Sequence, residues 1–546
     1  MPLALAVAAA LVVVTAITIR IVAASASNCA GELPVRVAAA PELAPIVADV
    51  ANAWMETEPR VGGRCIEMIV EALPPPVVAS SLTVYAGRAI DIAAEPEPTP
   101  SAETLPAVWI PDSSAWISRV QVVDRAAFVE DLRSVASTPV VLATTEPLGQ
   151  QLGFPNPLPL SAISGMLNES GVRFGVAEPR RETASLAMTM LLGDALATGD
   201  EDLPLLVRTF RNLVKVTSTR ELLAAIGDRA DAGPATEQAV LAHNQSGGQP
   251  ALVAVRLDEA GALLDYPYAI RSGISRETSQ AAEMFRSELF GSAAVSALAQ
   301  RGFRAPDGTV GPGFPDSTAT DPGPFAGAPV TDSTAIRTAL GLWSAANSPS
   351  RTLALFDVTA SMATGMATTT GPSTRAGVMA AAAQGGLSLF TNDSRVGMWA
   401  FGAQYQEVLP IDDLTQERRA EFNARMAAAR PTGSDRSELY DTLLAAYQVM
   451  LEGYDKTRPN IIVVLTDGGD SSSDPLRLEE FNQELQKLAD PTRPIRVVLI
   501  GIDVSESDAA NLQAIADIVG GGFFPLTSPE QIQTIFLKAL LRVGAA

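Results

Sequence analysis

Short apolar segments that alternate with segments of helical pattern constrain the fold of this chain most strongly. In the second half, the segments 352–358, 395–402, 461–468 and 495–503 are apolar along almost their whole length. Central strands of a parallel sheet have this composition, because both of their faces are buried. The alternation predicts a doubly wound, Rossmann-like α/β sheet, whose ligands bind beyond the carboxyl ends of the strands.

The first half shows a similar alternation. Its predicted strands include 34–40, 65–73, 107–111, 139–145 and 251–257, and a predicted amphipathic helix covers 41–55. We expect an α/β domain with parallel sheets here. Between the halves, residues 311–330 contain five Pro and four Gly among twenty residues, which favours an interdomain linker.

Composition excludes several classes of function. The formal net charge of −22 argues against binding to nucleic acid or to anionic lipid headgroups. A single His, His243, and two Cys leave little material for a Ser-His-Asp triad or a structural zinc site. The sequence also has no phosphate-binding loop motif. We therefore expect a protein that is not an enzyme, with a structural His243.

The first residues predict a membrane segment. Residues 2–19 carry no charge, and a helix over 3–24 would be about 33 Å long, enough to cross a bilayer. A cleaved signal peptide is the alternative, because small residues at 24–26 resemble a cleavage site. We expect a single-pass protein of the cell membrane with its bulk outside the cytoplasm, or a secreted protein if residues 1–26 are removed.

Export bears on the two cysteines. In an oxidising compartment Cys29 and Cys65 are expected to form a disulfide. Two buried free thiols are the alternative.

Oxygen-bearing side chains gather where two predicted strands end. Asp357 ends one strand and is followed by Thr359 and Ser361, and Asp467 ends another. Because the carboxyl ends of parallel strands meet at one edge, these side chains can converge. Carboxylates and hydroxyls without nitrogen or sulfur ligands suit a hard cation, Mg²⁺ above all. The alternative is that Asp357 caps a turn and that the hydroxyls cap the next helix.

Three segments resemble the von Willebrand factor type A domain. "DVTAS" at 357–361 resembles its D-x-S-x-S motif, "SELYD" at 437–441 its third loop, and "LTDGGD" at 465–470 its second acidic strand end. The order and spacing also agree, and the resemblance covers roughly residues 350 to 546. It implies a metal-ion-dependent adhesion site for Mg²⁺, or for Mn²⁺ or Ca²⁺.

The resemblance also implies roles for single residues. Thr359, Ser361 and Ser437 would bind the metal directly, and Asp357 and Asp467 would hold it largely through water. An open coordination position would take a carboxylate from a protein partner. Thr359 stands where the family usually has Ser, and Ser437 where it usually has Thr, but both keep the hydroxyl. Thr432 is an alternative third-loop ligand.

The first domain resembles the bacterial extracellular solute-binding proteins over roughly residues 30 to 308. Segments such as "PVRVAAAPELAPIVADVANAW" and "AGPATEQAVLAHN" carry this resemblance. It implies two lobes with a ligand in the cleft between them. Candidate cleft residues lie at strand ends, where ordinary loop or capping chemistry is the alternative. They are Pro111, Asp112, Ser113, Thr144, Thr145, Glu178 and Glu237.

The expected organisation follows. Residues 1–26 form an anchor or signal segment, 30–308 a solute-binding-like domain, 309–349 a linker and 350–546 a type A domain. We expect a membrane-anchored adhesion protein that binds a protein partner through its metal. The alternative is the solute receptor of a transport or sensing system, in which the type A domain serves as the docking module.

Overall fold

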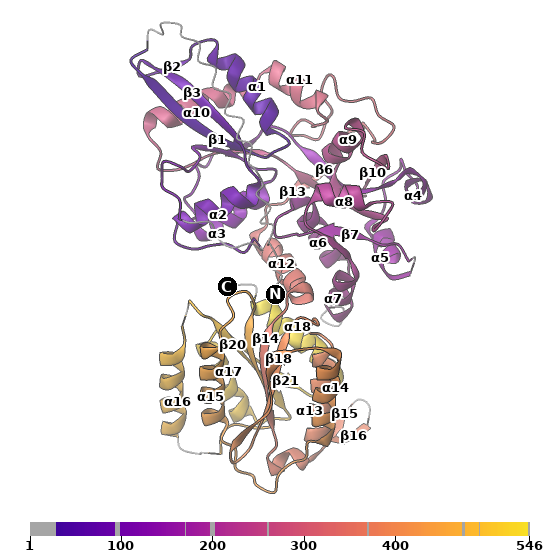
Figure 1. Ribbon diagram of the computed structural model, residues 1–546, viewed down its shortest axis with the longest axis vertical. Coiled ribbons are helices and arrows are strands. Elements are labelled where there is room, and N and C mark those ends of the chain that lie inside the picture. The colour runs from indigo at the N-terminus through magenta and orange to yellow at the C-terminus, as the bar shows by residue number, and fades with distance from the viewer. Residues whose placement is uncertain are drawn as a thin grey trace, which may run out of the picture. The chain divides into compact units, whose positions relative to one another are not determined.

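The computed structural model describes most of the chain as two compact units (Figure 1). The predicted anchor or signal segment lies outside the described residues, and within them no helix is both long and apolar enough to cross a membrane. The described ranges are 29–92, 99–169, 171–196, 203–258, 261–368, 371–471, 475–490 and 492–543. The first unit comprises the described residues up to Leu191 together with Leu213–Ile336, and the second comprises those from Leu192 to Asn212 and from Arg337 onward.

One sheet of the first unit has the strand order β2-β3-β1-β4-β12-β5. Strands β3, β1 and β4 are parallel, whereas β12 runs antiparallel to β4. The strands are β1 (Glu32–Ala39), β2 (Arg60–Val61), β3 (Arg64–Ala72), β4 (Val108–Ile110), β5 (Arg133–Ser134) and β12 (Pro267–Ile270). Cys29 is bonded to Cys65 of β3, with Cα atoms 5.6 Å apart, so the predicted disulfide is confirmed.

The other large sheet of this unit is mostly antiparallel, so the prediction of parallel sheets is wrong there. Strand β6 runs antiparallel to β9, β10 and β11. Its apolar sequence reports burial on both faces, and such burial does not determine the direction of the neighbouring strands. The strands are β6 (Thr138–Thr145), β9 (Ala232–Thr236), β10 (Leu252–Arg256), β11 (Ala262–Leu264) and β13 (Ala328–Pro329); β7 (Gly175–Ala177) and β8 (Val214–Val216) form a separate parallel pair.

Helices follow many of these strands. Several begin at a side-chain cap, as α3 does at Ser113, whose hydroxyl accepts a hydrogen bond from the backbone N–H of Ala115. The helices are α1 (Ala44–Met55), α2 (Pro75–Tyr85), α3 (Ser114–Val123), α4 (Glu146–Gln151), α5 (Leu160–Glu169), α6 (Thr183–Leu196), α8 (Thr219–Ala225), α9 (Glu237–Gln245), α10 (Arg276–Leu289) and α11 (Ser292–Gln300). The last residues of α6 belong to the second unit.

The second unit contains the predicted doubly wound sheet, in the order β18-β17-β14-β19-β20-β21. All neighbours are parallel except β18, which runs antiparallel to β17 at one edge. The two edge strands, β18 and β21, were not predicted, because β18 is largely exposed and β21 is short and contains Pro525. The strands are β14 (Arg351–Asp357), β17 (Arg395–Phe401), β18 (Tyr405–Asp413), β19 (Asn460–Thr466), β20 (Ile495–Ile502) and β21 (Gly522–Leu526).

Helices cover both faces of this sheet, with α15, α16 and α17 on one face and α13 and α14 on the other (Figure 1). The helices of this unit are α7 (Leu203–Asn212), α12 (Ser333–Asn347), α13 (Arg375–Leu387), α14 (Gln416–Ala428), α15 (Leu439–Glu452), α16 (Pro475–Leu488), α17 (Glu506–Ile518) and α18 (Ile532–Val543). Shorter elements are the 3₁₀ turns η2 (Ala360–Ala363) and η3 (Pro529–Gln531) and a hairpin of β15 (Gly365–Thr368) and β16 (Gly371–Thr374).

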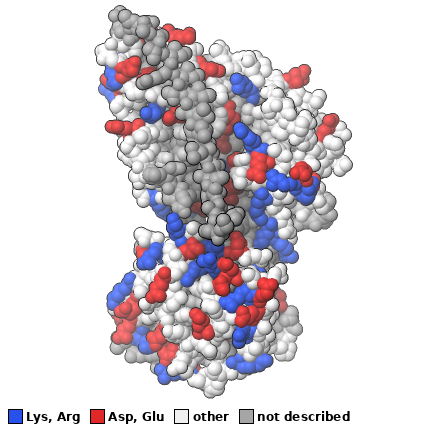
Figure 2. Space-filling view, viewed as in Figure 1, with Lys and Arg blue, Asp and Glu red and all other residues white. Residues whose placement is uncertain are grey.

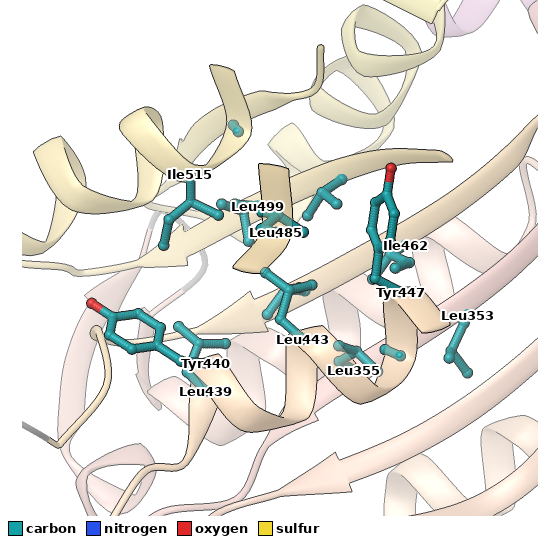
Figure 3. Packing of buried hydrophobic residues seen from close by; sticks show 14 of the residues in the cluster. Leu353, Leu355, Leu439, Tyr440, Leu443, Tyr447, Ile462, Leu485, Leu499 and Ile515 are labelled. Atoms are coloured by element: carbon teal, nitrogen blue, oxygen red, sulfur yellow. The ribbon is translucent and has the colours of Figure 1, made fainter. Parts of the chain in front are cut away.

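Alternate side chains of β14 fill the two cores on either side of the sheet. Leu353 and Leu355 are fully buried against α15 in a cluster that also takes in Leu443 (Figure 3). Ala354 and Phe356 lie on the opposite face, toward α13 and α14. A shift of one residue in the register of β14 would exchange these faces, so packing fixes where the strand ends.

Helix α7 belongs to the second unit, although its sequence lies inside the range predicted for the solute-binding-like domain. Phe210 of α7 is fully buried, with its ring centroid 6.1 Å from that of Trp343 in α12. Arg211 donates hydrogen bonds to the carbonyls of Ala346, at 2.8 Å, and of Ser388, at 3.2 Å. Helix α12, in turn, lies inside the range predicted as a linker.

Candidate functional site

The carboxyl ends of β14 and β19 bring two polar loops to one edge of the sheet. Phe356 pairs with Leu465 in this parallel register, so the loops that start at Asp357 and at Asp467 leave the sheet side by side. Asp357 is 1% exposed and Thr359 is 2% exposed. Burial of a carboxylate is costly unless its oxygens are hydrogen-bonded, which makes its partners informative.

Both carboxylate oxygens of Asp357 accept hydrogen bonds. Oδ1 accepts from the backbone N–H of Thr359, at 2.9 Å, and from its hydroxyl, at 2.6 Å. Oδ2 accepts from the hydroxyl of Thr466 in β19, also at 2.6 Å. Burial raises the pKa of Asp357, and the hydrogen bonds from Thr359 and Thr466 partly offset that rise. Asp357 therefore joins the two loops across the sheet edge.

The hydroxyls extend this network to the second acid. Thr359 Oγ1 lies 2.9 Å from Ser361 Oγ, which donates to Asp467 Oδ1, also at 2.9 Å. Four of the residues predicted to hold a metal thus form a continuous series of close oxygen–oxygen contacts from Asp357 to Asp467. Their donor atoms are the oxygens that Mg²⁺ prefers in proteins.

The third loop lies against the other two. The backbone N–H of Ala360 donates to the carbonyl of Ser434, at 2.9 Å, and that of Ser471 to the carbonyl of Ser437, also at 2.9 Å. Ser437 is 7% exposed, and its hydroxyl has no hydrogen-bond partner among the described residues. A buried polar group left without a partner costs about 1–3 kcal/mol. The Ser437 hydroxyl is therefore suited to a ligand at this edge, and the donor set fits a hard divalent cation.

Thr432 differs from Ser437 in its surroundings. It is exposed, and its hydroxyl lies 3.4 Å from the carbonyl oxygen of Ser434. Its backbone N–H donates to the carbonyl of Val358, at 2.7 Å, so it positions the loop. Among the described residues no group of three or more His, Cys, Asp or Glu side chains is placed to hold a metal, and the edge offers two carboxylates with hydroxyls instead.

Two residues that contact this site, Thr466 and Arg375, were not predicted from the sequence. Thr466 directly precedes Asp467, and a hydroxyl at a strand end next to an acid was a usable signal. Arg375, the first residue of α13, donates to Asp467 Oδ2 at 2.9 Å. Nothing in the pattern around Arg375 indicates this contact, because only the fold brings the start of α13 to the end of β19.

In the first unit the structure gathers Asp112 with acidic side chains from other segments, whereas the Ser113 hydroxyl caps α3. Asp112 follows β4, and its Oδ1 atom is buried without a hydrogen-bond partner among the described residues. Burial, and next to it the charge of Glu42, raises the pKa of Asp112 well above its usual range, and a hydrogen bond from Thr183 opposes that rise. Burial also raises the pKa values of Glu42, Glu182 and Asp265.

Neutral hydrogen-bonding groups surround these acids. Tyr266 donates from its hydroxyl to Glu42 Oε1, at 2.8 Å, and Ser114 donates from its hydroxyl to Asp265 Oδ2, at 2.6 Å. The ring N–H of Trp116 donates to the hydroxyl of Thr183, at 2.9 Å. The group of Glu42, Asp112, Glu182 and Asp265, here called the acidic group, thus joins segments next to β4, β12, α1 and α6.

The other predicted cleft residues are not gathered with the acidic group. Pro111 is buried and directly precedes Asp112 in the chain. The hydroxyl of Thr144 donates to the carbonyl of Asp231, at 2.8 Å, and Thr145 lines a separate hollow of about 300 Å³. Glu178 pairs with Arg180 at 2.7 Å. Glu237 is fully buried in an ion pair with Arg304 at 2.6 Å, which favours the structural alternative for Glu237.

Comparison with known proteins agrees with the prediction of a solute-binding-like domain followed by a type A domain. Residues 35–304 match the family of bacterial extracellular solute-binding proteins, and residues 376–538 match the von Willebrand factor type A (VWA) domain. The chain is a solute-binding domain joined to a VWA domain. The VWA match begins just after the Asp357 loop and the hairpin β15–β16, which precede α13 in the chain.

One curated protein and two solved structures illustrate what the chain is similar to. Uncharacterized protein Rv1836c of Mycobacterium tuberculosis is 27% identical over 547 residues, which span 91% of this chain and 75% of that protein. A periplasmic thiamin binding protein is 13% identical, with a TM-score of 0.39, and the match covers 58% of this chain and 96% of that one. A von Willebrand factor type A protein from Catenulispora acidiphila is 16% identical, with a TM-score of 0.29, and the match covers 36% of this chain and 42% of that one.

The acidic group of the solute-binding domain predicts how the stability of this domain depends on pH. A raised pKa means that the folded state favours the protonated acid. The contribution of Asp112 to the free energy of unfolding is therefore present at low pH and is lost as pH rises through the raised pKa. Asp112→Asn stays neutral, and we expect it to unfold a few degrees higher than the wild type at pH 8. Calorimetry between pH 5 and pH 8 should show this difference widening with pH. Asp49→Asn, which removes an exposed acid from α1, is the control, and an equal effect of both variants would contradict the expectation.

Proposed function

We propose that the protein is an extracytoplasmic binding protein whose VWA domain holds a protein partner through a divalent ion. The buried Ser437 hydroxyl, which has no hydrogen-bond partner among the described residues, carries this proposal. The carbonyl of Ser437 accepts a hydrogen bond from the backbone N–H of Ser471 in the Asp467 loop, and Asp467 in turn accepts one from Ser361. A packed interior rarely leaves such a hydroxyl unsatisfied, unless a ligand or water completes it.

Each residue has a role in this proposal. Thr359, Ser361 and Ser437 would hold the ion directly, and Asp357 and Asp467 would hold it largely through water. Neutral hydroxyls in contact with the ion leave it electrophilic. When bound, the ion offers a position to an anionic oxygen, so the partner would present an acidic side chain.

Surface charge favours the ion over a charged patch as the contact point. In the view of Figure 2, acidic and basic side chains are interspersed over the VWA domain. The net charge of −22 would repel an acidic partner at long range, but charges farther apart than about 8 Å are largely screened at physiological salt. Attraction at the ion acts at about 2 Å.

The proposed location rests on the disulfide and on the first residues. The bond between Cys29 and Cys65 fits an oxidising compartment outside the cytoplasm. We propose that residues 1–26 anchor the chain to the membrane, or direct its secretion if they are cleaved. The lone His243 bonds to the carbonyl oxygen of Pro250, at 3.1 Å, which supports its structural role, and no catalysis is proposed.

Ser437→Ala separates a metal ligand from a structural residue. Without divalent ions the variant should unfold at or slightly above the wild-type temperature, because it removes a buried hydroxyl that no described residue satisfies. With Mg²⁺ the wild type should gain about 2.7 kcal/mol at one hundred times its dissociation constant, whereas the variant should gain much less. Calorimetric titration with Mg²⁺ and with Mn²⁺ measures the affinities directly.

Thr432→Ala is the matched control, because it removes an exposed hydroxyl from the same loop and should leave metal binding intact. Loss of metal binding in Thr432→Ala alone would assign the third-loop ligand to Thr432. Partner binding is tested by capture from surface extracts with Mg²⁺ and then with EDTA, using Thr359→Ala and Asp467→Ala. If capture survives EDTA, or falls only in step with melting temperature, the adhesion proposal fails.

A second function, capture of a small solute, is favoured by Asp112. Its buried Oδ1 atom lacks a partner among the described residues and lies in the acidic group. Ionised acids in a partly buried group are stabilised by a positive charge, so the favoured solute is an organic cation with an ammonium or guanidinium group. In this case the VWA domain would dock the receptor on a transport or sensing complex.

A thermal-shift screen of matched solutes tests this second function. Cationic amines should raise the melting temperature of the wild type, whereas neutral and anionic analogues of the same size should not. Asp112→Asn should abolish the rise while it keeps the fold, and Asp49→Asn should keep it. A rise with anions, or one that persists in Asp112→Asn, would contradict the assignment.

A further inference from the structure

Arg375 forms an ion pair with Asp467, one of the two acids of the candidate metal site. Its Nη1 donates to Asp467 Oδ2, at 2.9 Å, and Ser361 donates to the other oxygen, Oδ1, also at 2.9 Å. The Asp467 side chain is 4% exposed and that of Arg375 is 19% exposed, so this ion pair is largely shielded from water. Both oxygens of Asp467 are therefore occupied by groups of the protein.

A second acid fixes Arg375 from the other side. Its Nη2 and Nε donate to Asp503 Oδ2, at 2.8 and 3.2 Å, and Nη2 also reaches the backbone carbonyl of Asp503, at 3.4 Å. Asp503 follows β20 with a φ of 54°, a left-handed conformation that is uncommon outside glycine. The guanidinium thus bridges the ends of β19 and β20.

The position of Arg375 is unfavourable for a cation in its own helix. It is the first residue of α13, whose N-terminus is capped by the Thr374 hydroxyl and carries the positive end of the helix dipole. Cations are stabilised at the opposite end of a helix, so the pairs with Asp467 and Asp503 must outweigh this effect. The arrangement places a permanent positive charge against an acid that a metal ion would also need.

We propose that Arg375 is a built-in counter-cation of the candidate metal site and lowers its affinity for divalent ions. This inference rests on the proposed metal site and adds a residue that tunes it. A divalent ion near Asp467 is repelled by the guanidinium and must share the carboxylate with it. For charges of one and two units about 6 Å apart, the repulsion in bulk water corresponds to a change in affinity on the order of tenfold, and the change is larger at a site that is shielded from water. The site would then load only at high concentrations of divalent ion.

Titration of the full chain with Mn²⁺, followed by electron paramagnetic resonance and calorimetry, tests the proposal. Arg375→Gln removes the charge but keeps hydrogen-bonding capacity, and we expect it to bind Mn²⁺ at least about tenfold more tightly than the wild type. Arg375→Lys keeps the charge and should stay near the wild-type affinity. Arg395→Gln is the matched control, because Arg395 pairs with Asp413 at the opposite end of β17 and its loss changes the net charge equally.

The outcomes separate this inference from the metal site itself. Equal affinity in the wild type and Arg375→Gln, or weaker binding in the variant, would overturn the role of Arg375 while the metal site stands. An equal gain in Arg395→Gln would reduce the effect to net charge and would also overturn it. If neither the wild type nor any variant binds Mn²⁺, the proposed metal site fails together with the inference. Circular dichroism checks folding, and Arg375→Met serves as a second neutral variant that keeps the apolar stem.

Discussion

Burial of β14 on both faces is the constraint on which the VWA domain and its candidate site depend. Leu353 and Leu355 pack on one side, and Ala354 and Phe356 pack on the other. Because both faces are filled, polar chemistry is confined to the strand end, where Asp357 begins the loop. The hydrogen bond from Thr466 to Asp357 then joins β19 to this loop, so two strand ends share one polar centre.

The core of the VWA domain and most of the candidate site were predictable from sequence because they depend on local pattern. Wholly apolar strands reported two-sided burial, and an acid after each of two strands placed Asp357 and Asp467 at one edge. Thr359 and Ser361 followed from their spacing to Asp357. Arg375 was not predictable, because its partners Asp467 and Asp503 become its neighbours only after α13 has packed on the sheet.

The first domain shows where pattern is insufficient. Apolar runs located β6 and β10, but direction depends on tertiary connections, and these strands are antiparallel. The position of Asp112 after a strand identified it as a candidate, and its buried Oδ1 atom has no partner among the described residues. Glu237 was chosen in the same way, but it forms an ion pair with Arg304. Helix α7 was not predicted, and Trp343, on which its Phe210 packs, lies far along the chain. In each case the missing information is the identity of a distant partner.

The central claim is that the edge formed by Asp357, Thr359, Ser361, Ser437 and Asp467 holds a divalent ion. A crystal of the full chain grown with Mn²⁺, measured near the manganese absorption edge, tests this claim most directly. The account predicts an anomalous peak at coordination distance from the hydroxyl oxygens of Thr359, Ser361 and Ser437, with Arg375 still beside Asp467. A crystal with saturating Mn²⁺ and no peak at this edge, with water bonded to the Ser437 hydroxyl instead, would contradict it.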